Sequence, residues 1–300
     1  MQQVKNASKV AISFLARDCE NSLHGFLTEI ERLRSFFLSS QVYILENGSK
    51  DSTKDILKKY QASSASVILN TIDDTEFDIL PRIEKMAKLR NAILDMVRNS
   101  YFLPDYYIVI DGDLDFDAVS VIQAIQNAPD DWSALFANGR YFLKVGNLRI
   151  PVLYYDLFAY LPFENIAGKG DCLTKREMIE LRKAIQKGLR TSNYLKCRSA
   201  FGGVGVYRYD CIGNSRYSVE KNTRSLEFEH LCEHIPFNRE ISKKGELLIC
   251  RDMKVYYEQI PLKTWLKALA IDNNKEKEMK KAKVFLNRLF SGHRETRNKS

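Results

Sequence analysis

Three aspartates at alternate positions, Asp111, Asp113 and Asp115, close a short run of apolar and aromatic residues. Adjacent carboxylates repel one another and lose solvation when they are buried. A divalent cation such as Mn²⁺ or Mg²⁺ removes both costs, and it accepts one or two carboxylates together with water and phosphate oxygens. We therefore predict that Asp111 and Asp113 hold a metal ion completed by a diphosphate. The alternative is an acidic turn after a strand, because Asp-x-Asp is frequent in turns.

A strand at residues 106–110 is predicted to position these acids. Its residues are β-branched or aromatic and apolar on both faces, which is typical of a buried strand in a parallel sheet. Open α/β sheets bind ligands at the carboxyl ends of their strands, where Asp111 and Asp113 would lie. Gly112 between them leaves room for a ligand to approach the backbone.

Strand-like and helix-like segments alternate through the first 117 residues. The predicted strands are residues 10–15, 41–45, 66–69 and 106–110, and the predicted helices are residues 23–37, 53–60 and 82–99. This alternation predicts an α/β fold with a doubly wound, mostly parallel sheet flanked by helices. Further predicted elements are helices at 119–127 and 175–187, strands at 134–137 and 247–250, and a glycine-interrupted strand at 199–207.

The polar loop after the second strand, residues 46–53, has short side chains that can hydrogen-bond a base or a ribose. Asn47 and Asp51 are the candidates for this contact. The alternative is a loop that only caps the next helix, since Asp51 or Ser52 stands where an N-cap is expected.

Arg82 and Arg90 are eight residues apart in a predicted helix, about two turns, so they share a face. A guanidinium offers a fixed fork of donors that matches phosphate oxygens, so Arg90 could reach a diphosphate. The alternative is an ordinary solvated helix face.

The second half of the chain is rich in aromatic residues. Trp132 and the run Tyr154-Tyr155-Asp156 could form an aromatic platform with a carboxylate, a surface on which sugars bind. The alternative is ordinary core. The glycines within residues 199–207, Gly203 among them, mark either a bulge or the close approach of a ligand.

Glu233 and His234 lie among other acids in residues 227–234, and the chain has only four histidines. A glutamate beside a sugar hydroxyl can act as general base, and a histidine can be a further metal ligand. The alternative is a charged surface strand.

Composition limits the remaining possibilities. The 300 residues carry a net charge of +8, of which residues 263–300, with eleven Lys/Arg and four acids, hold nearly all. A neutral body with a basic tail argues against a nucleic-acid-binding protein. The six cysteines show no metal-binding spacing, and no secretory or membrane-spanning segment is apparent. We therefore expect a cytoplasmic protein.

The basic tail has a helical pattern with apolar residues on one side. It could lie on an anionic membrane surface, which would make the protein peripheral to the inner face of the cytoplasmic membrane. The alternative is a terminal helix that docks on the body with its basic face in solvent.

Taken in order, these motifs resemble the GT-A fold glycosyltransferases, enzymes that use a nucleotide-sugar. The matching segments are residues 16–20, residues 46–53, Arg82 with Arg90-Asn91, and residues 110–113. A narrower resemblance is to the cryptococcal mannosyltransferase (capsule-associated) family and its bacterial relatives. It rests on Arg90-Asn91, Tyr155-Asp156, residues 199–203 and residues 232–234, within a similarity that covers roughly residues 10–250.

The resemblance implies a set of roles. The donor would be bound by Arg17, Glu46, Asn47, Asp51, Arg82, Arg90, Asp111, Gly112 and Gly203. The metal would be held by Asp111, Asp113 and His234. The acceptor would be bound by Trp132 and Tyr155, and the catalytic residues would be Glu233 and Asp156. Because Asp115 extends the acidic motif, the resemblance leaves open which carboxylate contacts the metal directly.

The implied organisation is a GT-A-like domain over residues 1–260, with a nucleotide-binding half at about 1–117 and an acceptor half at about 118–260. A basic amphipathic helical tail would follow at residues 261–300.

The implied function is metal-dependent transfer of a sugar from a nucleoside-diphosphate sugar to a hydroxyl of a glycan or glycolipid, in surface polysaccharide biosynthesis. One alternative is a sugar-phosphate nucleotidyltransferase, although no glycine-rich basic loop follows the first strand. Another is a non-catalytic protein that binds a nucleotide-sugar on the same fold.

Overall fold

The computed structural model describes residues 6–72, 77, 79–145, 148–163, 175–221 and 229–261. Its first half contains β1 (Asn6–Ala16), α1 (Glu20–Arg34), β2 (Phe37–Glu46), α2 (Thr53–Ala62), β3 (Val67–Thr71), α3 (Arg82–Arg98), β4 (Tyr106–Asp111), β5 (Asp115–Phe116) and α4 (Ala118–Gln126). Its second half contains β6 (Trp132–Val145), β7 (Leu148–Tyr154), β8 (Leu161–Pro162), α5 (Lys175–Thr191), β9 (Tyr194–Ser199), β10 (Val204–Arg208), α6 (Tyr209–Ile212), α7 (His234–Ile241) and β11 (Glu246–Gln259). The predicted tail helix lies outside the described residues.

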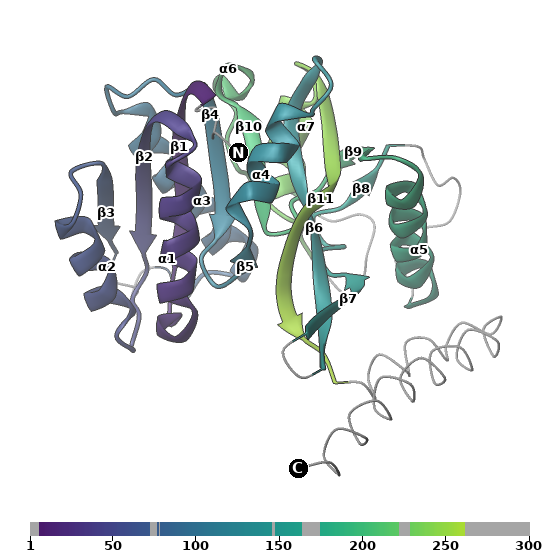
Figure 1. Ribbon diagram of the computed structural model, residues 1–300, viewed down its shortest axis with the longest axis horizontal. Helices are drawn as coiled ribbons and strands as arrows, with labels where there is room; N and C mark the ends of the chain where they lie inside the picture. Colours follow the sequence, from purple (N-terminus) through teal and green to yellow (C-terminus); the bar gives the residue numbers. More distant parts are fainter. Residues whose placement is uncertain are drawn as a thin grey trace, which may run out of the picture. The chain divides into compact units, whose positions relative to one another are not determined.

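One sheet joins the strands in the order β3-β2-β1-β4-β10-β6-β11-β9-β8, with helices on its faces (Figure 1). The strands of the first half, β3, β2, β1 and β4, are parallel, as the alternating pattern predicted. Beyond β4 the pairing is antiparallel where β10 meets β4 and β6, and where β9 meets β11. The predicted α/β fold is confirmed, and the four parallel strands come from the first half of the chain.

Two hydrophobic clusters cover the two faces of the sheet. Alternate residues of β1 divide between them, since Ile12 belongs to the cluster with α1 and α4 while Ala11 belongs to the cluster with α3, α5 and α7. Helix α1 buries Leu23, Phe26, Leu27, Ile30 and Leu33, the spacing expected for one helical face. The fold therefore places helices on both faces of the sheet.

The register of the parallel strands brings their carboxyl ends to one edge. Leu15 of β1 lies opposite Asp111 of β4, and Ala16 lies opposite Glu46 of β2. Gly112 follows directly, and a Cβ there would come within 2.5 Å of the Leu15 carbonyl oxygen. The acidic motif and the two polar loops are therefore neighbours, and the packing of the backbone against Leu15 requires glycine at position 112.

The glycine-interrupted strand predicted at residues 199–207 is two strands. β9 ends at Ser199 and β10 begins at Val204, with Gly202 (φ +64°) and Gly203 (φ +90°) in the turn between them. Positive φ values favour glycine, and a Cβ on Gly202 would come within 2.1 Å of the Ala137 carbonyl oxygen. The glycines thus make a turn that packs closely on β6.

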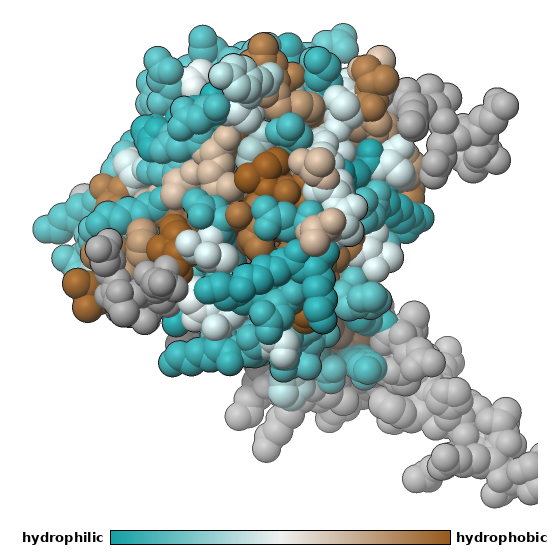
Figure 2. Space-filling model, turned by 90° about the vertical axis from the view of Figure 1, so that its left-hand side faces the viewer, coloured by the Kyte–Doolittle hydropathy of each residue, from teal (hydrophilic) through white to brown (hydrophobic). Residues whose placement is uncertain are grey.

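The described residues within 6–141 and 153–257 form one compact unit, and those within 142–152 and 258–261 belong to a second unit. Within the described residues, no helix is both long and apolar enough to cross a membrane. Hydrophilic residues cover most of the face shown in Figure 2, with hydrophobic residues in smaller groups among them. Cys19, Cys197, Cys211, Cys232 and Cys250 are free and buried, in keeping with the expected thiols.

Candidate functional site

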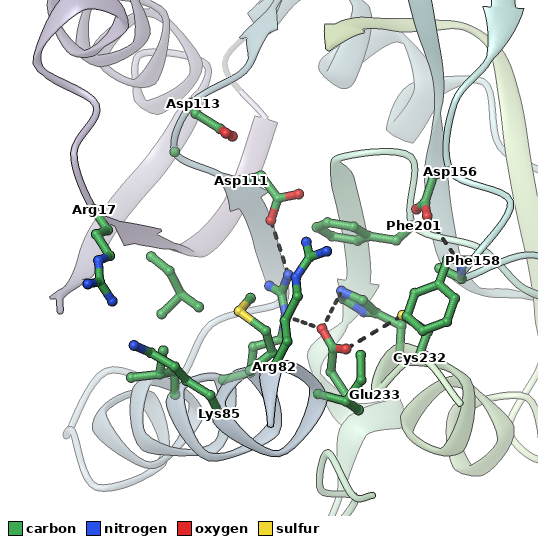
Figure 3. Close-up of a pocket in the computed structure, with 18 of the residues that line it drawn as sticks. Arg17, Arg82, Lys85, Asp111, Asp113, Asp156, Phe158, Phe201, Cys232 and Glu233 are labelled. Carbon is green, nitrogen blue, oxygen red and sulfur yellow. Dashed lines mark hydrogen bonds and ion pairs between the residues drawn. The ribbon is translucent and has the colours of Figure 1, made fainter. Parts of the chain in front are cut away.

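A pocket of about 530 Å³, termed the β4 pocket below, lies at the carboxyl end of β4 within the first compact unit. Its walls come from the loops after β1 and β2, from the first half of α3, from the segment after β7, and from the start of α7 (Figure 3). The predicted site residues that line it are Arg17, Asn47, Arg82, Arg90, Asp111, Gly112, Asp113, Tyr155, Asp156, Glu233 and His234. Residues far apart in the sequence therefore converge on the acidic motif.

The three aspartates of the motif have different surroundings. Asp111 and Asp113 line the β4 pocket, the first partly buried and the second exposed. Asp115 is exposed on β5, where it lies opposite Tyr256 of β11, and it does not line the pocket. Only the first two acids of the motif are therefore placed to share a ligand.

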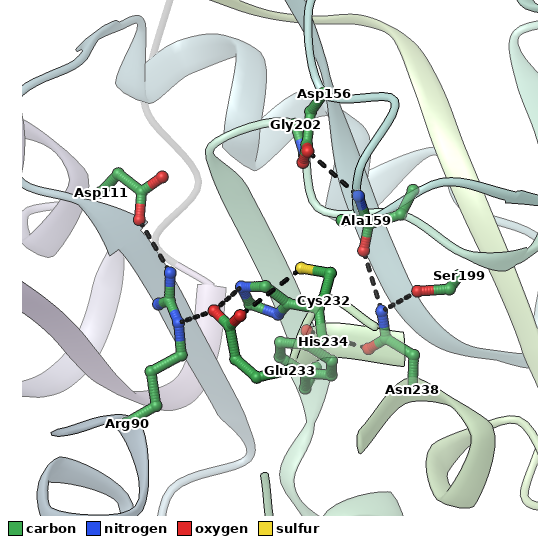
Figure 4. A network of polar contacts seen from close by, with 12 residues as sticks. Arg90, Asp111, Asp156, Ala159, Ser199, Gly202, Cys232, Glu233, His234 and Asn238 are labelled. Carbon is green, nitrogen blue, oxygen red and sulfur yellow. Dashed lines mark hydrogen bonds and ion pairs between the residues drawn. The ribbon is translucent and has the colours of Figure 1, made fainter. Parts of the chain in front are cut away.

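Arg90 joins two acids at the bottom of the pocket (Figure 4). Its Nη2 donates to Asp111 Oδ1 at 3.1 Å, and its Nε donates to Glu233 Oε1 at 3.0 Å. Burial alone would lower the pKa of Arg90, but the charges of Asp111 and Glu233 raise it. The Phe201 ring lies 5.0 Å from the guanidinium carbon. Arg90 is therefore a permanently charged bridge that orients one oxygen of Asp111.

The acids fit a divalent metal. Burial raises the pKa of Asp111 to about 6 against the opposing effect of Arg90, and the charge of Asp113 raises it further. A cation between the two carboxylates would relieve both effects. Among the described residues no group of three or more His, Cys, Asp or Glu side chains could hold a metal ion. An ion bound by Asp111 and Asp113 would thus need oxygens from water and a phosphate ligand, which suits Mg²⁺ or Mn²⁺.

His234 lines the pocket in a largely apolar setting. It is buried at 2% exposure, and its ring stacks on Phe201 at 4.0 Å. Among the described residues neither ring nitrogen has a hydrogen-bond partner, although Nε2 lies 3.9 Å from Glu233 Oε1. Burial lowers the pKa of His234 well below its usual value, and the charge of Arg90 lowers it further. His234 is therefore neutral, which is the form that binds metals. Its predicted role as a metal ligand stays a prediction, since it forms no three-residue cluster with the acids.

Asp156 anchors the turn that Gly202 makes. Its carboxylate accepts hydrogen bonds from the backbone N–H of Gly202 at 2.8 Å and of Ala159 at 3.2 Å. Burial raises the pKa of Asp156, and these two hydrogen bonds oppose that shift. The same turn reaches the acidic motif, because the Gly203 carbonyl oxygen accepts a hydrogen bond from Asp111 N–H at 3.0 Å.

Tyr155 forms an aromatic wall of the pocket together with Tyr257. The two rings stack with centroids 4.4 Å apart and planes 6° apart, and Tyr257 is 40% exposed. Gly139 makes room for Tyr155, since a Cβ there would lie 2.3 Å from the ring. The pair presents an accessible aromatic face beside Asp111 and Asp113.

The loops after β1 and β2 hold each other in place. Asp51 accepts hydrogen bonds from the backbone N–H of Glu20 and of Thr53. A hydrogen bond from the Thr53 side chain lowers the pKa of the Asp51 carboxyl group, and the two backbone bonds lower it further. Asp18 accepts from Lys50 N–H at 2.7 Å. Glu46 is buried, and its Oε1 accepts from Ser49 N–H. Asp51 and Glu46 thus shape the loops, while Asn47 faces the pocket.

Three basic side chains line the pocket near its opening, Arg17 from the loop after β1 and Arg82 and Lys85 from the first turn of α3 (Figure 3). Arg82 is exposed and Lys85 is partly buried. Together with Asp113 they make a mouth of mixed charge that can bind a phosphate and a metal ion.

Four predicted site residues do not line the pocket: Glu46, Asp51, Trp132 and Gly203. Trp132 is buried in the core, where it stacks on Tyr106 at 5.8 Å. For Trp132, the alternative of an ordinary core residue is therefore the correct one.

The pocket also contains residues that the sequence did not single out, among them Lys85, Phe158 and Tyr257. Lys85 could have been found, because it lies one helical turn after Arg82. Nothing in the sequence pointed to Tyr257. It lies in β11, more than a hundred residues after Tyr155, and only the folded sheet brings the two rings together.

Comparison with known proteins agrees with the fold. No protein-family profile matches the chain, and no curated protein matches it in sequence. Among solved structures it is similar to the mannosyltransferase PcManGT from Pyrobaculum calidifontis in complex with GDP-Man and Mn²⁺ (TM-score 0.50, 10% identity, 87% of this chain and 60% of that chain). Further similar structures are S. aureus TarS 1-349 in complex with UDP-GlcNAc (TM-score 0.49, 12% identity, 88% and 65%) and GalNAc-T7 with UDP, GalNAc and Mn²⁺ (TM-score 0.49, 14% identity, 86% and 44%).

The chain spans about 60% of the length of the mannosyltransferase. At this identity the similarity shows the fold alone, and it confirms the predicted GT-A-like fold.

Proposed function

We propose that the chain is a metal-dependent glycosyltransferase, a hexosyltransferase that moves a sugar from a nucleoside-diphosphate sugar to a hydroxyl of a glycan or glycolipid. The observation that carries the proposal is the β4 pocket, where Asp111 and Asp113 share a space with Arg17, Arg82 and Lys85. Acids beside cations suit a ligand that brings both a metal ion and a diphosphate. The similarity in fold to a mannosyltransferase supports the same function.

The donor diphosphate would lie between the metal site and the three cations at the mouth. Asp113, with the free oxygen of Asp111, would hold Mn²⁺ or Mg²⁺, which stabilises the negative charge of a leaving diphosphate. Arg17, Arg82 and Lys85 would bind phosphate oxygens. Asn47, at the end of β2, would hydrogen-bond the nucleoside.

Glu233 and Asp156, expected from the resemblance to be catalytic, have contacts that support positioning roles. Glu233 Oε1 accepts from Arg90, and its Oε2 accepts from the Cys232 thiol at 3.6 Å. Both oxygens of the Asp156 carboxylate accept hydrogen bonds, one from the N–H of Gly202 and one from the N–H of Ala159. Glu233 would fix Arg90, and through it Asp111, in the geometry that the metal requires.

The acceptor would stack on the aromatic wall of Tyr155 and Tyr257. Sugars bind aromatic faces through their C–H groups, and this wall lies beside the acids that would hold the donor. The resemblance to the cryptococcal mannosyltransferase family supports a place in surface polysaccharide biosynthesis. The basic tail supports contact with an anionic membrane surface, so deletion of residues 275–300 is expected to abolish binding to anionic liposomes.

The test measures turnover of nucleoside-diphosphate sugars in the presence of Mn²⁺. The reaction is monitored through the release of the nucleoside diphosphate. We expect Asp113→Ala to lower kcat/KM by about 100-fold or more, because a group that stabilises charge in the transition state is lost. Asp115→Ala is the matched control, since it removes an equivalent carboxylate that does not line the pocket. Release of pyrophosphate instead would identify a nucleotidyltransferase, and tight binding without turnover would identify a binding protein.

A further inference from the structure

A short segment that follows α6 is fastened along helix α3. Arg98 Nη2 donates hydrogen bonds to the backbone carbonyl oxygens of Gly213 at 2.7 Å and of Ser215 at 2.8 Å. About one turn nearer the start of the helix, the Asp95 carboxylate accepts two hydrogen bonds from Arg216, at 2.7 and 2.6 Å. None of these residues lines the β4 pocket, so these contacts hold the segment to the helix without touching the site.

Asn91 makes the next attachment, about one further turn towards the start of α3. Its Nδ2 donates to the Tyr217 carbonyl oxygen at 2.8 Å, and its Oδ1 accepts from the Tyr217 backbone N–H at 3.0 Å. An amide side chain has one donating and one accepting end, and here both ends bind the main chain of one residue. Asn91 directly follows Arg90 but does not line the β4 pocket, so its role is to fix Tyr217.

The ring of Tyr217 lies behind the bottom of the β4 pocket. Tyr217 is only 3% exposed, and its ring stacks on that of Phe237 with centroids 4.1 Å apart. The ring meets His234 edge to face at 5.4 Å, and its centroid lies 6.0 Å from the guanidinium carbon of Arg90. Tyr217 does not line the pocket itself, but it contacts two residues that do.

Arg90 is therefore confined by aromatic rings as well as by acids. The rings of Phe201 and Tyr217 lie 5.0 and 6.0 Å from its guanidinium carbon, within the range of attraction between a cation and an aromatic face. In this position the guanidinium donates to Asp111 and to Glu233. A shift of the Tyr217 ring would let the guanidinium move and would release the oxygen of Asp111 that it holds.

We propose that Asn91 and Tyr217 are positioning residues for the metal site, an inference that rests on the proposed function. Asn91 fixes the main chain of Tyr217, and the ring of Tyr217 confines Arg90. Arg90 in turn orients Asp111, one of the two carboxylates that would bind the metal ion. Neither Asn91 nor Tyr217 would touch a ligand, and groups that orient metal-binding side chains affect metal affinity through them.

The test measures the affinity of the full chain for Mn²⁺ alone, by a titration that follows the electron paramagnetic resonance signal of the free ion. We expect Asn91→Leu and Tyr217→Leu each to weaken Mn²⁺ binding by about tenfold, because Asp111 is no longer held in place. Tyr217→Phe should retain the affinity of the unaltered chain, since it keeps the ring that contacts Arg90.

Arg216→Met is the matched control. It removes an ion pair between two exposed side chains that fastens the same segment to the same helix, about one turn away from Asn91. We expect the Mn²⁺ affinity to stay unchanged in this variant. If the segment had only a structural role, all of these variants would melt at lower temperatures but would bind Mn²⁺ normally well below the melting temperature.

A double-mutant cycle tests whether Tyr217 acts through Arg90. Arg90→Lys keeps the positive charge but lacks the fork of donors that joins the two acids. Because the link is then already broken, Tyr217→Leu should weaken Mn²⁺ binding much less in the Arg90→Lys background than in the unaltered chain. Equal losses in the two backgrounds would mean that Tyr217 does not act through Arg90.

Three further results would overturn the inference. They are an unchanged Mn²⁺ affinity in Asn91→Leu and Tyr217→Leu, an equal loss of affinity in Arg216→Met, and a loss in Tyr217→Phe as large as in Tyr217→Leu. If the buried change Tyr217→Leu prevents folding, Asn91→Leu decides, because Asn91 is only partly buried. All of these results leave the proposed function standing, whereas an unaltered chain that binds no Mn²⁺ would overturn the proposed function and this inference together.

Discussion

The floor and the rim of the β4 pocket use the same residue types in different ways. The floor consists of Arg90, Asp111 and Glu233, and the side chains of Arg90 and Glu233 are each only 5% exposed. The rim consists of Arg17, Arg82, Lys85 and Asp113, which meet solvent at the mouth. Charges at the floor satisfy one another, whereas Arg82 and Asp113 at the rim are exposed and can bind a ligand.

This difference predicts that the floor residues of the pocket stabilise the fold and that the rim residues bind the ligand. Removal of one partner from a buried ion pair leaves an uncompensated charge, so floor residues should affect folding first. Exposed charges contribute little to stability, so rim residues should affect ligand affinity and leave the fold intact. Four measurements can break or sharpen this comparison.

The largest expected effect is on the floor. Arg90→Met should lower the free energy of unfolding by about 3–5 kcal/mol, because the buried Glu233 and the partly buried Asp111 would both lose their partner. Chemical denaturation followed by circular dichroism measures this change. Arg82→Met is the control, with an expected change within about 0.5 kcal/mol. Equal stability of the two variants would remove the distinction between floor and rim.

The next effect is on the rim. Arg82→Met and Lys85→Met should each weaken binding of a nucleoside diphosphate with Mn²⁺ by about tenfold, since a charged hydrogen bond contributes about 1.5–3 kcal/mol. Calorimetric titration measures the affinity, and the loss should shrink at high salt. Lys88→Met on the same helix is the control, because Lys88 pairs with Glu84 at 3.2 Å and does not line the pocket. A similar loss in Lys88→Met would point to a general effect of charge.

An effect of similar size is expected at Asp111, which belongs to the floor but faces the metal site. Its pKa of about 6 means that it takes up a proton as the pH falls through 6. Metal binding needs the carboxylate, so the Mn²⁺-dependent affinity should fall about tenfold between pH 7 and pH 5. Titration of the affinity against pH tests this, and a flat profile down to pH 5 would mean that Asp111 does not ligate the metal.

Protonation of Asp111 weakens metal binding but favours folding, so the pH affects stability in the opposite direction. Because the pKa of Asp111 is higher in the folded chain than the usual 3.8, the folded state binds the proton more tightly than the unfolded state. Without metal, this group therefore favours folding at low pH, and that contribution is lost as the pH rises through about 6. Thermal unfolding of Asp111→Asn without metal should lack this part of the pH dependence.

Much of the fold could be predicted from local patterns. The strand at residues 106–110, the helix around Arg90 and the parallel strands of the first half all follow from periodicity, because side chains at regular spacing must bury one face. The convergence of Asp111 and Asn47 was also predictable, since parallel strands end at one edge of the sheet. The antiparallel second half was less accessible, because its strands pair over long and irregular connections.

The sequence by itself determined which residues could do chemistry and where the acidic motif would lie in the sheet, because hydrophobic spacing and strand ends are local properties. Only the tertiary structure decided what each residue does. It joined Arg90 to Glu233 across 143 residues and placed Trp132 in the core, where it stacks on Tyr106. Burial and charge pairing depend on side chains that meet only in the folded chain, and these two properties separate a ligand-binding charge from a structural one.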